Sequence, residues 1–315
     1  MRNNGMTISD CAEYLIQRDR FLIVTHLRPD GDTLGSAAAL CAALRRMGKT
    51  AWMFPNSEIT PKYMDYVNEY IGDSNDADCI VSVDVAETRM LCEGFSGNID
   101  LCIDHHPTNI GFAENNLVCG DKAACGEIVL SLIEEMCGDV SPAEATLLYL
   151  AVSTDTGCFR YANVTADTFH CAGKLTENGA DIREINFKIF RQTSKSRMLL
   201  EGEICAGMKF YHGGELVAAT LTLDTLEKCG ATENDCDDIA SIPGRAEGCI
   251  VSILIRELEP GKCKASLRSH PGFDCSAVAQ RFAGGGHKLA SGCTIYESPE
   301  KCREMLVNAV LEDMK

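Results

Sequence analysis

Four short segments in the first half of the chain carry aspartates and histidines next to apolar runs. Their acid and imidazole side chains belong to His26, Asp30, Asp32, Asp84, Asp104, His105, His106 and Asp155. Burying so many carboxylates without a cation is costly. Mixed imidazole and carboxylate ligands suit Mn²⁺ or a similar ion better than Ca²⁺, which prefers oxygen alone. The set therefore predicts a site for a pair of divalent metal ions.

Each segment has a simpler interpretation when it is taken alone. Asp30-Gly31-Asp32 is typical of a turn in which Asp32 caps the following helix. Asp84 resembles a residue that caps the end of a strand, and a lone histidine is usually an ordinary surface or core residue. The metal-site hypothesis rests on the combination.

Elements that could position these residues alternate through the first 190 or so residues. Strand-like apolar runs lie at 21–25, 50–54, 79–83 and 100–103, and helical patterns lie at 32–47, 124–136, 142–153 and 166–178. This alternation predicts a mixed α/β fold with a parallel sheet and helices on both of its faces. Ligands of such sheets bind at the carboxyl ends of the strands. Three of the four segments should meet there, and the fourth, after a helix, could join them.

The rest of the chain reads as a smaller α+β domain. Strand patterns lie at 215–223, 248–255 and 262–269, with helices near Thr225 and at 276–282 and 299–311. A polar stretch at 192–197 precedes it. We expect a first domain that carries the metal site over residues 1–190, a linker over 191–200 and a second domain over 201–315.

The charge balance restricts the choice of partners. The 315 residues include 29 lysines and arginines against 46 aspartates and glutamates, a formal net charge of −17. Long nucleic acid is gripped by displacing counterions with basic side chains, so a whole-surface nucleic-acid binder is disfavoured. Residues 262–288 carry a net positive charge instead, with five basic residues and one aspartate. An anion would bind there, although a solvated charged surface is the alternative interpretation.

Cysteine usage and hydropathy bear on the compartment. None of the 18 cysteines forms a C-x-x-C pair, so we interpret them as reduced packing residues. No apolar run approaches the length of a membrane span, and the first ten residues lack the apolar region of a secretory signal. The expected location is the cytoplasm, without membrane attachment.

The ordered set resembles a known enzyme family. The residues His26-x-x-x-Asp30-x-Asp32, Asp84, Asp104-His105-His106 and Asp155 resemble the DHH phosphoesterase superfamily. Residues 266–269 and 284–292, with Gly-Gly-Gly-His, resemble the associated DHHA1 domain. With segment 154–161, the chain is similar over residues 15–311 to the bacterial bifunctional oligoribonucleases and pAp phosphatases (NanoRNase A-like). The chain departs from the pattern of this family at two positions. Ala283 stands where the family often has glycine, and Ser291 stands where it often has alanine.

The resemblance implies roles for the clustered side chains. One ion would be held by His26, Asp30 and Asp84, and the other by Asp32, Asp84, His105 and Asp155, with Asp84 bridging. The ions would be Mn²⁺, with Mg²⁺ or Co²⁺ possible, and together they would activate the attacking water. Asp104 would orient a neighbouring group, and His106 would face the scissile phosphate as a hydrogen-bond donor or proton carrier.

The resemblance also implies a substrate clamp in the second domain. Its expected members are Arg268, Ser269, Gly284, Gly285, Gly286 and His287. Arginine offers a bidentate fork for a phosphate, and glycines let backbone N–H groups approach one closely. The alternative interpretation of three glycines is an ordinary flexible turn.

The activity implied is metal-dependent hydrolysis of phosphoester bonds. The substrates would be short single-stranded RNA or DNA oligonucleotides, dinucleotides and 3′-phosphoadenosine 5′-phosphate (pAp), and a homodimer is possible. Alternatives within the class are enzymes specific for pGpG, cyclic dinucleotides or pyrophosphate. A noncatalytic nucleotide-binding module is the alternative from another class, and it would be expected to have lost ligands.

Overall fold

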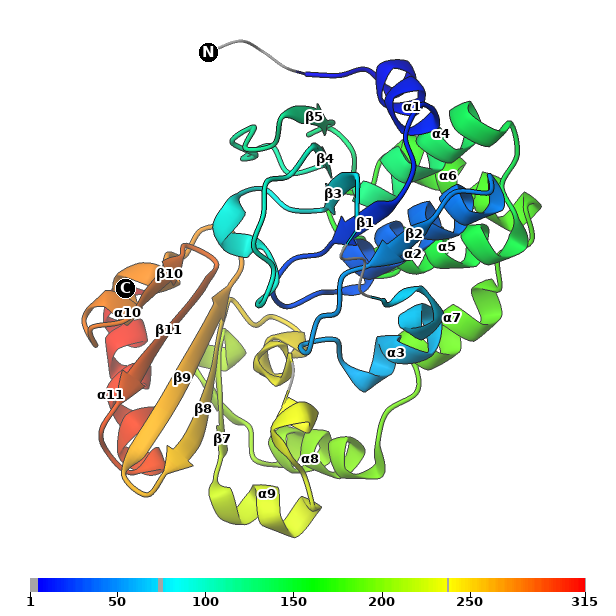
Figure 1. Ribbon diagram of the computed structural model, residues 1–315. Helices are drawn as coiled ribbons and strands as arrows, with labels where there is room; N and C mark the ends of the chain where they lie inside the picture. The colour runs from blue at the N-terminus through cyan, green and yellow to red at the C-terminus, as the bar shows by residue number, and fades with distance from the viewer. Residues whose placement is uncertain (1–4, 73–75, 237, 315) are drawn as a thin grey trace. The chain divides into compact units, whose positions relative to one another are not determined.

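The computed structural model describes residues 5–72, 76–236 and 238–314 of the chain (Figure 1). Contacts divide the protein into two compact units, Met1–Gln192 and Thr193–Lys315. Each unit is built on its own sheet, which confirms the predicted mixed α/β class.

The first unit contains a five-stranded sheet in the order β2-β1-β3-β4-β5, and all of its described pairings are parallel. The strands are β1 (Phe21–Val24), β2 (Ala51–Met53), β3 (Cys79–Val83), β4 (Leu101–Asp104) and β5 (Asn115–Val118). Strands β1 and β4 are buried along their whole length. Their near-continuous apolar sequences are typical of strands covered on both faces.

The helices of the first unit connect these strands or follow them. They are α1 (Ile8–Ile16), α2 (Gly31–Arg46), α3 (Pro61–Val67), α4 (Cys125–Cys137), α5 (Pro142–Asp155), α6 (Ala166–Glu177) and α7 (Ile182–Phe190), with 3₁₀ turns η1 (Asn68–Tyr70) and η2 (Thr88–Met90). Capping boxes at Thr7, Ser141 and Thr165 fix where α1, α5 and α6 begin.

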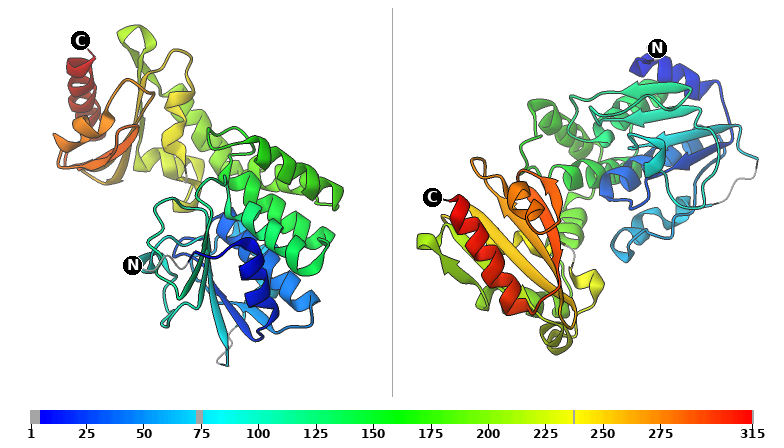
Figure 2. Two further views of the ribbon diagram at one scale, coloured as in Figure 1. Left: turned by 90° about the horizontal axis from the view of Figure 1, so that it is seen from above. Right: turned by 90° about the vertical axis from the view of Figure 1, so that its left-hand side faces the viewer.

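Helices α2 and α4 pack on one face of the sheet, seen edge-on in the left view of Figure 2, and the other helices pack against these two or against α5. The opposite face carries a smaller apolar cluster in which Val24 and Cys102 meet Cys92, Ile99 and Ala113. Those last three residues lie on connecting segments, because the links from β3 to β4 and from β4 to β5, described throughout, contain no α-helix. The expectation of helices on both faces is corrected here. Apolar loop residues take the place of the second helical layer.

Helix α2 is the central helix of this layer. Its residues from Gly31 to Cys41 are all buried, which would be unusual for a helix on the surface. At Gly35 a Cβ atom would lie 2.4 Å from the carbonyl oxygen of Leu147 on α5. The glycine therefore lets α2 and α5 approach closely, which fixes the position of both helix ends that carry site residues.

The second unit contains a six-stranded sheet in the order β10-β11-β9-β8-β7-β6. Its strands are β6 (Lys209–Tyr211), β7 (Leu216–Leu221), β8 (Val251–Glu259), β9 (Lys262–Ser269), β10 (Gly285–His287) and β11 (Ala290–Ile295). Strands β7 and β8 are parallel, and the other neighbours are antiparallel. The short strands β6, β10 and, in the first unit, β5 were not expected from the sequence.

Helices of the second unit contribute to two apolar clusters. They are α8 (Lys195–Ala206), α9 (Leu223–Cys229), α10 (Cys275–Gln280) and α11 (Pro299–Asp313), with 3₁₀ turns η3 (His212–Gly214), η4 (Glu233–Cys236), η5 (Ile239–Ser241) and η6 (Pro243–Arg245). Residues of α10 and α11 form one cluster with β7, β8, β9 and β11. Residues of α8, α9 and η5 form the other with β7 and β8.

Two sequence expectations differ from this unit. Residues 195–200 of the expected linker belong to α8, because Ser194 caps that helix by accepting from the N–H of Arg197 at 2.9 Å. The expected glycine loop is largely strand β10, in which Gly285 pairs with Gly292.

All 18 cysteines carry free thiols, and most of them are buried. Within the described ranges, no helix has both the length and the apolar character needed to cross a lipid bilayer.

Candidate active site

Neighbouring strands of the first unit bring the predicted metal-binding residues together. His26 lies two residues after β1, Asp84 directly after β3 and His105 directly after β4. Strand β3 lies between β1 and β4, so the three carboxyl ends are adjacent. Asp155 is the last residue of α5 and reaches the same place from a helix.

The start of α2 supplies the two remaining carboxylates. Asp30 is the N-cap residue, and its Oδ1 accepts from the N–H groups of Asp32 and Thr33 at 3.0 and 3.1 Å. Asp32 is held by the start of α4, whose Cys125 and Gly126 N–H groups donate to Oδ2 and Oδ1 at 2.7 and 3.0 Å. A helix N-terminus favours the charged form of such a carboxylate.

Donor atoms of these residues form three overlapping groups in which all atoms lie within 4.8 Å of one another. The groups are His26, Asp30 and Asp84; Asp32, His105 and Asp155; and Asp84, His105 and His106. Nε2 of His105 lies 3.4 Å from Asp84 Oδ1, 3.6 Å from Asp155 Oδ2 and 3.7 Å from Asp32 Oδ2. Nε2 of His26 lies 3.7 Å from Asp30 Oδ1 and 3.8 Å from Asp84 Oδ2.

Asp84 is at the centre of this arrangement and is not satisfied by the protein. The residue is 3% exposed, yet its Oδ1 has no hydrogen-bond partner among the described residues. Its backbone φ of 60° is unusual for a residue other than glycine, which is typical of a strained functional position. A buried carboxylate oxygen without a partner costs about 1–3 kcal/mol. A cation would remove that cost, so the donor set fits a metal ion.

Burial and like charge affect the acids in the same direction. Burial, reinforced by the charge of Asp84, raises the pKa of Asp32 well above its usual value. Burial likewise raises the pKa of Asp84, and it raises that of Asp155 to about 6. Burial alone would lower the pKa of His105, but the nearby carboxylates of Asp84 and Asp32 outweigh it and raise the pKa. The cluster without metal therefore retains protons that a cation would displace.

A carbonyl group sets the orientation of His105. Its Nδ1 lies 3.1 Å from the carbonyl oxygen of Lys122, so Nδ1 carries the hydrogen and donates it. Nε2 then presents its lone pair to the carboxylate cluster when the ring is neutral. Such a contact behind an imidazole is typical of metal-binding histidines.

Asp104 supports the second histidine of the pair. This fully buried residue accepts from Nδ1 of His106 at 2.7 Å and from the side-chain amide of Asn109 at 2.6 Å. Burial would raise the pKa of Asp104, but these hydrogen bonds outweigh it and lower the pKa. The same hydrogen bond from Nδ1 to Asp104 raises the pKa of His106. His106 is thus a positioned and partly exposed proton donor.

The expected clamp residues of the second unit fall in two places. Arg268 and Ser269 line a hollow of about 260 Å³ together with Arg245 and His270. Oγ of Ser269 donates to the carbonyl oxygen of Phe273 at 2.9 Å. The serine therefore ties the end of β9 to the segment that follows it. No acidic residue of the described chain lines this hollow, which makes it suited to an anion.

The glycines at 284–286 are not equivalent. A Cβ atom at Gly284 would lie 2.2 Å from the carbonyl oxygen of Gly292, and one at Gly286 would lie 2.6 Å from that of Ala290. These two glycines allow β10 to approach β11. The N–H of Gly284 already donates to Ala279 at 2.9 Å. Only Gly285 of the three faces open space, and His287 beside it is exposed.

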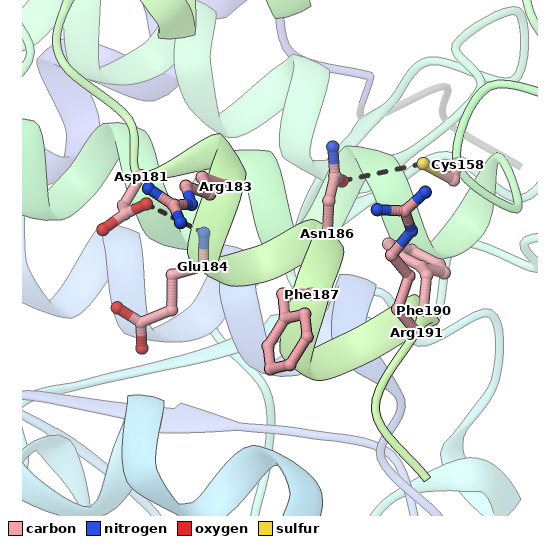
Figure 3. Close-up of a pocket in the computed structure, with 8 residues that line it drawn as sticks. All are labelled: Cys158, Asp181, Arg183, Glu184, Asn186, Phe187, Phe190 and Arg191. Atoms are coloured by element: carbon pink, nitrogen blue, oxygen red, sulfur yellow. Dashed lines mark hydrogen bonds between the residues drawn. The ribbon is translucent and has the colours of Figure 1, made fainter.

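A separate hollow of about 840 Å³ lies along α7 and holds none of the predicted site residues (Figure 3). Arg183 and Arg191 line it together with Asp181 and Glu184, so its charges balance. Cys158 lies at its edge, where the thiol approaches the side-chain oxygen of Asn186 at 3.6 Å. We assign it no role.

Sequence reasoning missed several supporting groups. These are the amides of Cys125 and Gly126, the carbonyl of Lys122, the Asn109 side chain, and Arg245 and His270. The position of Asn109, three residues after His106 and before a glycine turn, is the one local signal among them. The Lys122 carbonyl and the two amides contact residues that are 17 to 94 positions away in the sequence. Such contacts cannot be predicted from the pattern of a single segment.

Comparisons with known proteins agree with this architecture. Residues 20–152 match the N-terminal domain of the DHH family, and residues 214–315 match the DHHA1 domain. The bifunctional oligoribonuclease and PAP phosphatase NrnA of Thermus thermophilus is 32% identical over 301 residues, covering 93% of this chain and 89% of the relative. The NrnA of Bacillus subtilis is 25% identical, covering 90% and 92%.

A solved structure shows the same fold over almost the whole chain. The crystal structure of an exopolyphosphatase-related protein from Bacteroides fragilis superposes with a TM-score of 0.82 at 25% identity, covering 97% of this chain and 96% of that one. From its two matched domains and its likeness to NrnA proteins along nearly its full length, the chain belongs to the NrnA family of DHH–DHHA1 proteins.

Proposed function

We propose that this protein hydrolyses phosphoester bonds of short oligoribonucleotides and dinucleotides, and removes a phosphate from pAp. The NrnA relatives are named for these activities. The observation that carries the proposal is the unsatisfied Oδ1 of Asp84, which lies 3.4 Å from Nε2 of His105 in a cluster with further carboxylates. Members of the DHH family are metal-dependent, and this donor set suits a divalent cation.

We propose that these donor groups hold two ions, which we expect to be Mn²⁺. His26, Asp30 and Asp84 would hold one ion, whereas Asp32, Asp84, His105 and Asp155 would hold the other, with Asp84 shared. Bound together, such ions neutralise charge on a phosphate and increase the acidity of water. Mg²⁺ and Co²⁺ satisfy the same ligand chemistry.

We propose that the imidazole of His106 contacts the scissile phosphate directly. Its Nδ1 is committed to Asp104, so Nε2 is the atom left for substrate. The raised pKa of His106 keeps the ring protonated to higher pH. Nε2–H would donate to a non-bridging phosphate oxygen or protonate the leaving oxygen. Asp104 acts through His106 and is a positioning residue.

The second unit is proposed to bind one end of the substrate through its phosphate. Arg268 would contact a terminal phosphate from the 260 Å³ hollow, with Ser269 shaping the hollow. His287 and the open backbone at Gly285 would add contacts. Gly284 and Gly286 belong to the packing of β10 on β11 and are not proposed as phosphate ligands. A cytoplasmic location and a homodimer stay predictions from the sequence.

A substrate panel with Mn²⁺ tests the proposal. Purified protein is incubated with pAp, 5′-phosphorylated di- to pentaribonucleotides, pGpG, a cyclic dinucleotide, pyrophosphate and a 24-residue RNA. We expect turnover of pAp and the shortest linear RNAs, with the 24-residue RNA at least tenfold slower. Exclusive turnover of pGpG, a cyclic dinucleotide or pyrophosphate would replace the proposed substrate class. Tight nucleotide binding without turnover would identify a binding module.

A further inference from the structure

One strand of the second unit presents a polar row on the face opposite α11. Along β9, Cys263, Ala265 and Leu267 are buried in the cluster that contains α11 residues. Side chains alternate between the two faces of a strand. Lys264, Ser266 and Arg268 therefore share the other face.

The neighbouring strand makes this row a shallow track. Thr294, Gly292 and Ala290 of β11 lie opposite Lys264, Ser266 and Arg268 respectively. Between the two basic residues, Ser266 has Gly292 of β11 on one side and the buried Leu254 of β8 on the other. The β11 side of the track is thus low in the middle, and the track is basic at both ends.

The Lys264 end has its own groove, separate from the hollow at Arg268. Its volume is about 510 Å³, and its lining includes Lys264, Phe282, Gly285 and Tyr296 but no acidic residue of the described chain. Tyr296 is 74% exposed, so its ring is available for stacking. A large exposed aromatic beside a cation is typical of single-stranded nucleic-acid sites.

Lys264 differs from the basic residues around it. Arg256 on β8 is paired with Glu233, and Lys262 is paired with Glu259 at 2.8 Å. For Lys264, no carboxylate within ion-pair distance is found among the residues that the structure describes. The positive charge of Lys264 helps to lower the pKa of Glu233 from a greater distance. That glutamate already forms an ion pair with Arg256. The ammonium group is therefore available to a phosphate.

We infer that Lys264 and Tyr296 form a second nucleotide subsite, which holds oligonucleotides of three or more residues at a point distinct from Arg268. The inference rests on the proposed function and deepens it, because it names which substrates gain from the subsite. Lys264 contacts a backbone phosphate, and the ring of Tyr296 stacks on a base.

The spacing of the two basic residues determines which substrates reach both. Four residues of a strand span about 13 Å, whereas a stacked nucleic-acid strand advances about 3.4 Å per nucleotide. A substrate must therefore supply about four stacked nucleotides, or fewer when extended, to contact Lys264 and Arg268 together. A single nucleotide such as pAp engages one end only. The subsite thus distinguishes short RNA from pAp.

The test compares ligands of three lengths on the full-length protein. Equilibrium binding of pAp, a 5′-phosphorylated diribonucleotide and a 5′-phosphorylated pentaribonucleotide is measured in EDTA, which prevents turnover. Hydrolysis is measured separately with Mn²⁺. The variants are Lys264→Gln and Tyr296→Ala. Matched controls are Lys301→Gln on α11, which packs on the opposite face of the sheet, and Phe210→Ala on the distant edge strand β6.

Each subsite variant is expected to weaken pentaribonucleotide binding about tenfold and to change pAp and dinucleotide binding less than twofold. Lys264→Gln should also reduce the slope of log affinity against log salt for the pentamer by about 0.7, the value for one phosphate contact. The two controls should match the unmodified protein. Thermal unfolding of each variant verifies that it is folded.

Three outcomes would overturn the inference: an unchanged affinity of both variants for the pentamer, an equal loss for all three ligands, or no preference of the unmodified protein for the pentamer over the dinucleotide. If the protein hydrolyses none of the ligands, the proposed function fails. The binding arm in EDTA still decides whether the subsite exists.

Discussion

Asp84 and His105 face each other across the ends of β3 and β4, with Oδ1 of the acid 3.4 Å from Nε2 of the imidazole. Neither atom has a closer partner in the described chain that would satisfy it, since Oδ1 forms no hydrogen bond and the ring donates from Nδ1 to Lys122. Two donor atoms bound to one ion at about 2.1 Å lie roughly 3–3.5 Å apart. The pair is therefore close to the separation that metal binding requires.

The Asp84→Asn variant tests this relationship. Loss of the shared carboxylate should lower kcat by at least about 1,000-fold, because both proposed ion sites lose a ligand. Mn²⁺ at 100 times its dissociation constant should stabilise the unmodified protein by about 2.7 kcal/mol and the variant much less. Enzyme assays and thermal unfolding with and without Mn²⁺ measure the two effects.

Asp78→Asn serves as the matched control, since Asp78 forms an exposed ion pair with Arg20. It should retain both activity and stabilisation by Mn²⁺. Near-normal turnover of Asp84→Asn would contradict the proposed centre.

Asp104→Asn separates positioning from metal binding. The amide keeps the shape of the carboxylate but has only one oxygen that can accept a hydrogen bond. It therefore cannot accept from both His106 and Asn109, and the His106 ring loses its orientation. We expect kcat to fall about 10- to 100-fold, with KM and Mn²⁺ affinity changed less than about threefold. A variant that loses Mn²⁺ binding as severely as Asp84→Asn would show that Asp104 is itself a ligand.

The sequence predicted that these residues would lie close together because they follow parallel strands or begin a helix. His26, Asp84 and His105 could be placed by counting from apolar runs, and parallel topology then required them to meet. Asp155 was harder to place because it ends a helix, whose direction depends on the packing of α5 on α2. That packing depends on close approach at Gly35, which no local pattern reveals.

Other features depended on contacts that sequence periodicity does not encode. The second face of the first sheet is covered by loop residues such as Cys92 and Ile99, whose apolar character is not periodic. The glycines at 284–286 have the composition of a loop, yet Gly284 and Gly286 are needed for strand contact. Composition could not distinguish an open loop from a close-packed strand, because both favour residues without Cβ atoms.

Metal binding should be coupled to pH. Burial raises the pKa of Asp155 to about 6, and neighbouring carboxylates raise the pKa of His105, but each binds a cation only when deprotonated. Mn²⁺ affinity should therefore fall as pH falls, by up to about tenfold per pH unit for each proton displaced.

Calorimetric titration at pH 7 in two buffers with different ionisation enthalpies measures the protons released. We expect a net release of at least one proton per protein. Titrations repeated between pH 6 and pH 8 give the slope. A buffer-independent enthalpy with a flat affinity across that range would be inconsistent with protonated ligands in the metal-free centre.

Gly284→Ala and Gly285→Ala form a matched pair that separates packing from substrate contact. A Cβ atom at Gly284 would lie 2.2 Å from the carbonyl oxygen of Gly292, whereas one at Gly285 would meet no atom within 4 Å. Gly284→Ala should destabilise the protein by about 2 kcal/mol or more, because backbone must move to accommodate the methyl group. Gly285→Ala should change stability by less than about 0.5 kcal/mol.

If a phosphate approaches the open backbone at Gly285, the same methyl group should raise KM several-fold without changing the unfolding temperature. Equal destabilisation by the two variants would contradict the separate roles assigned to these glycines.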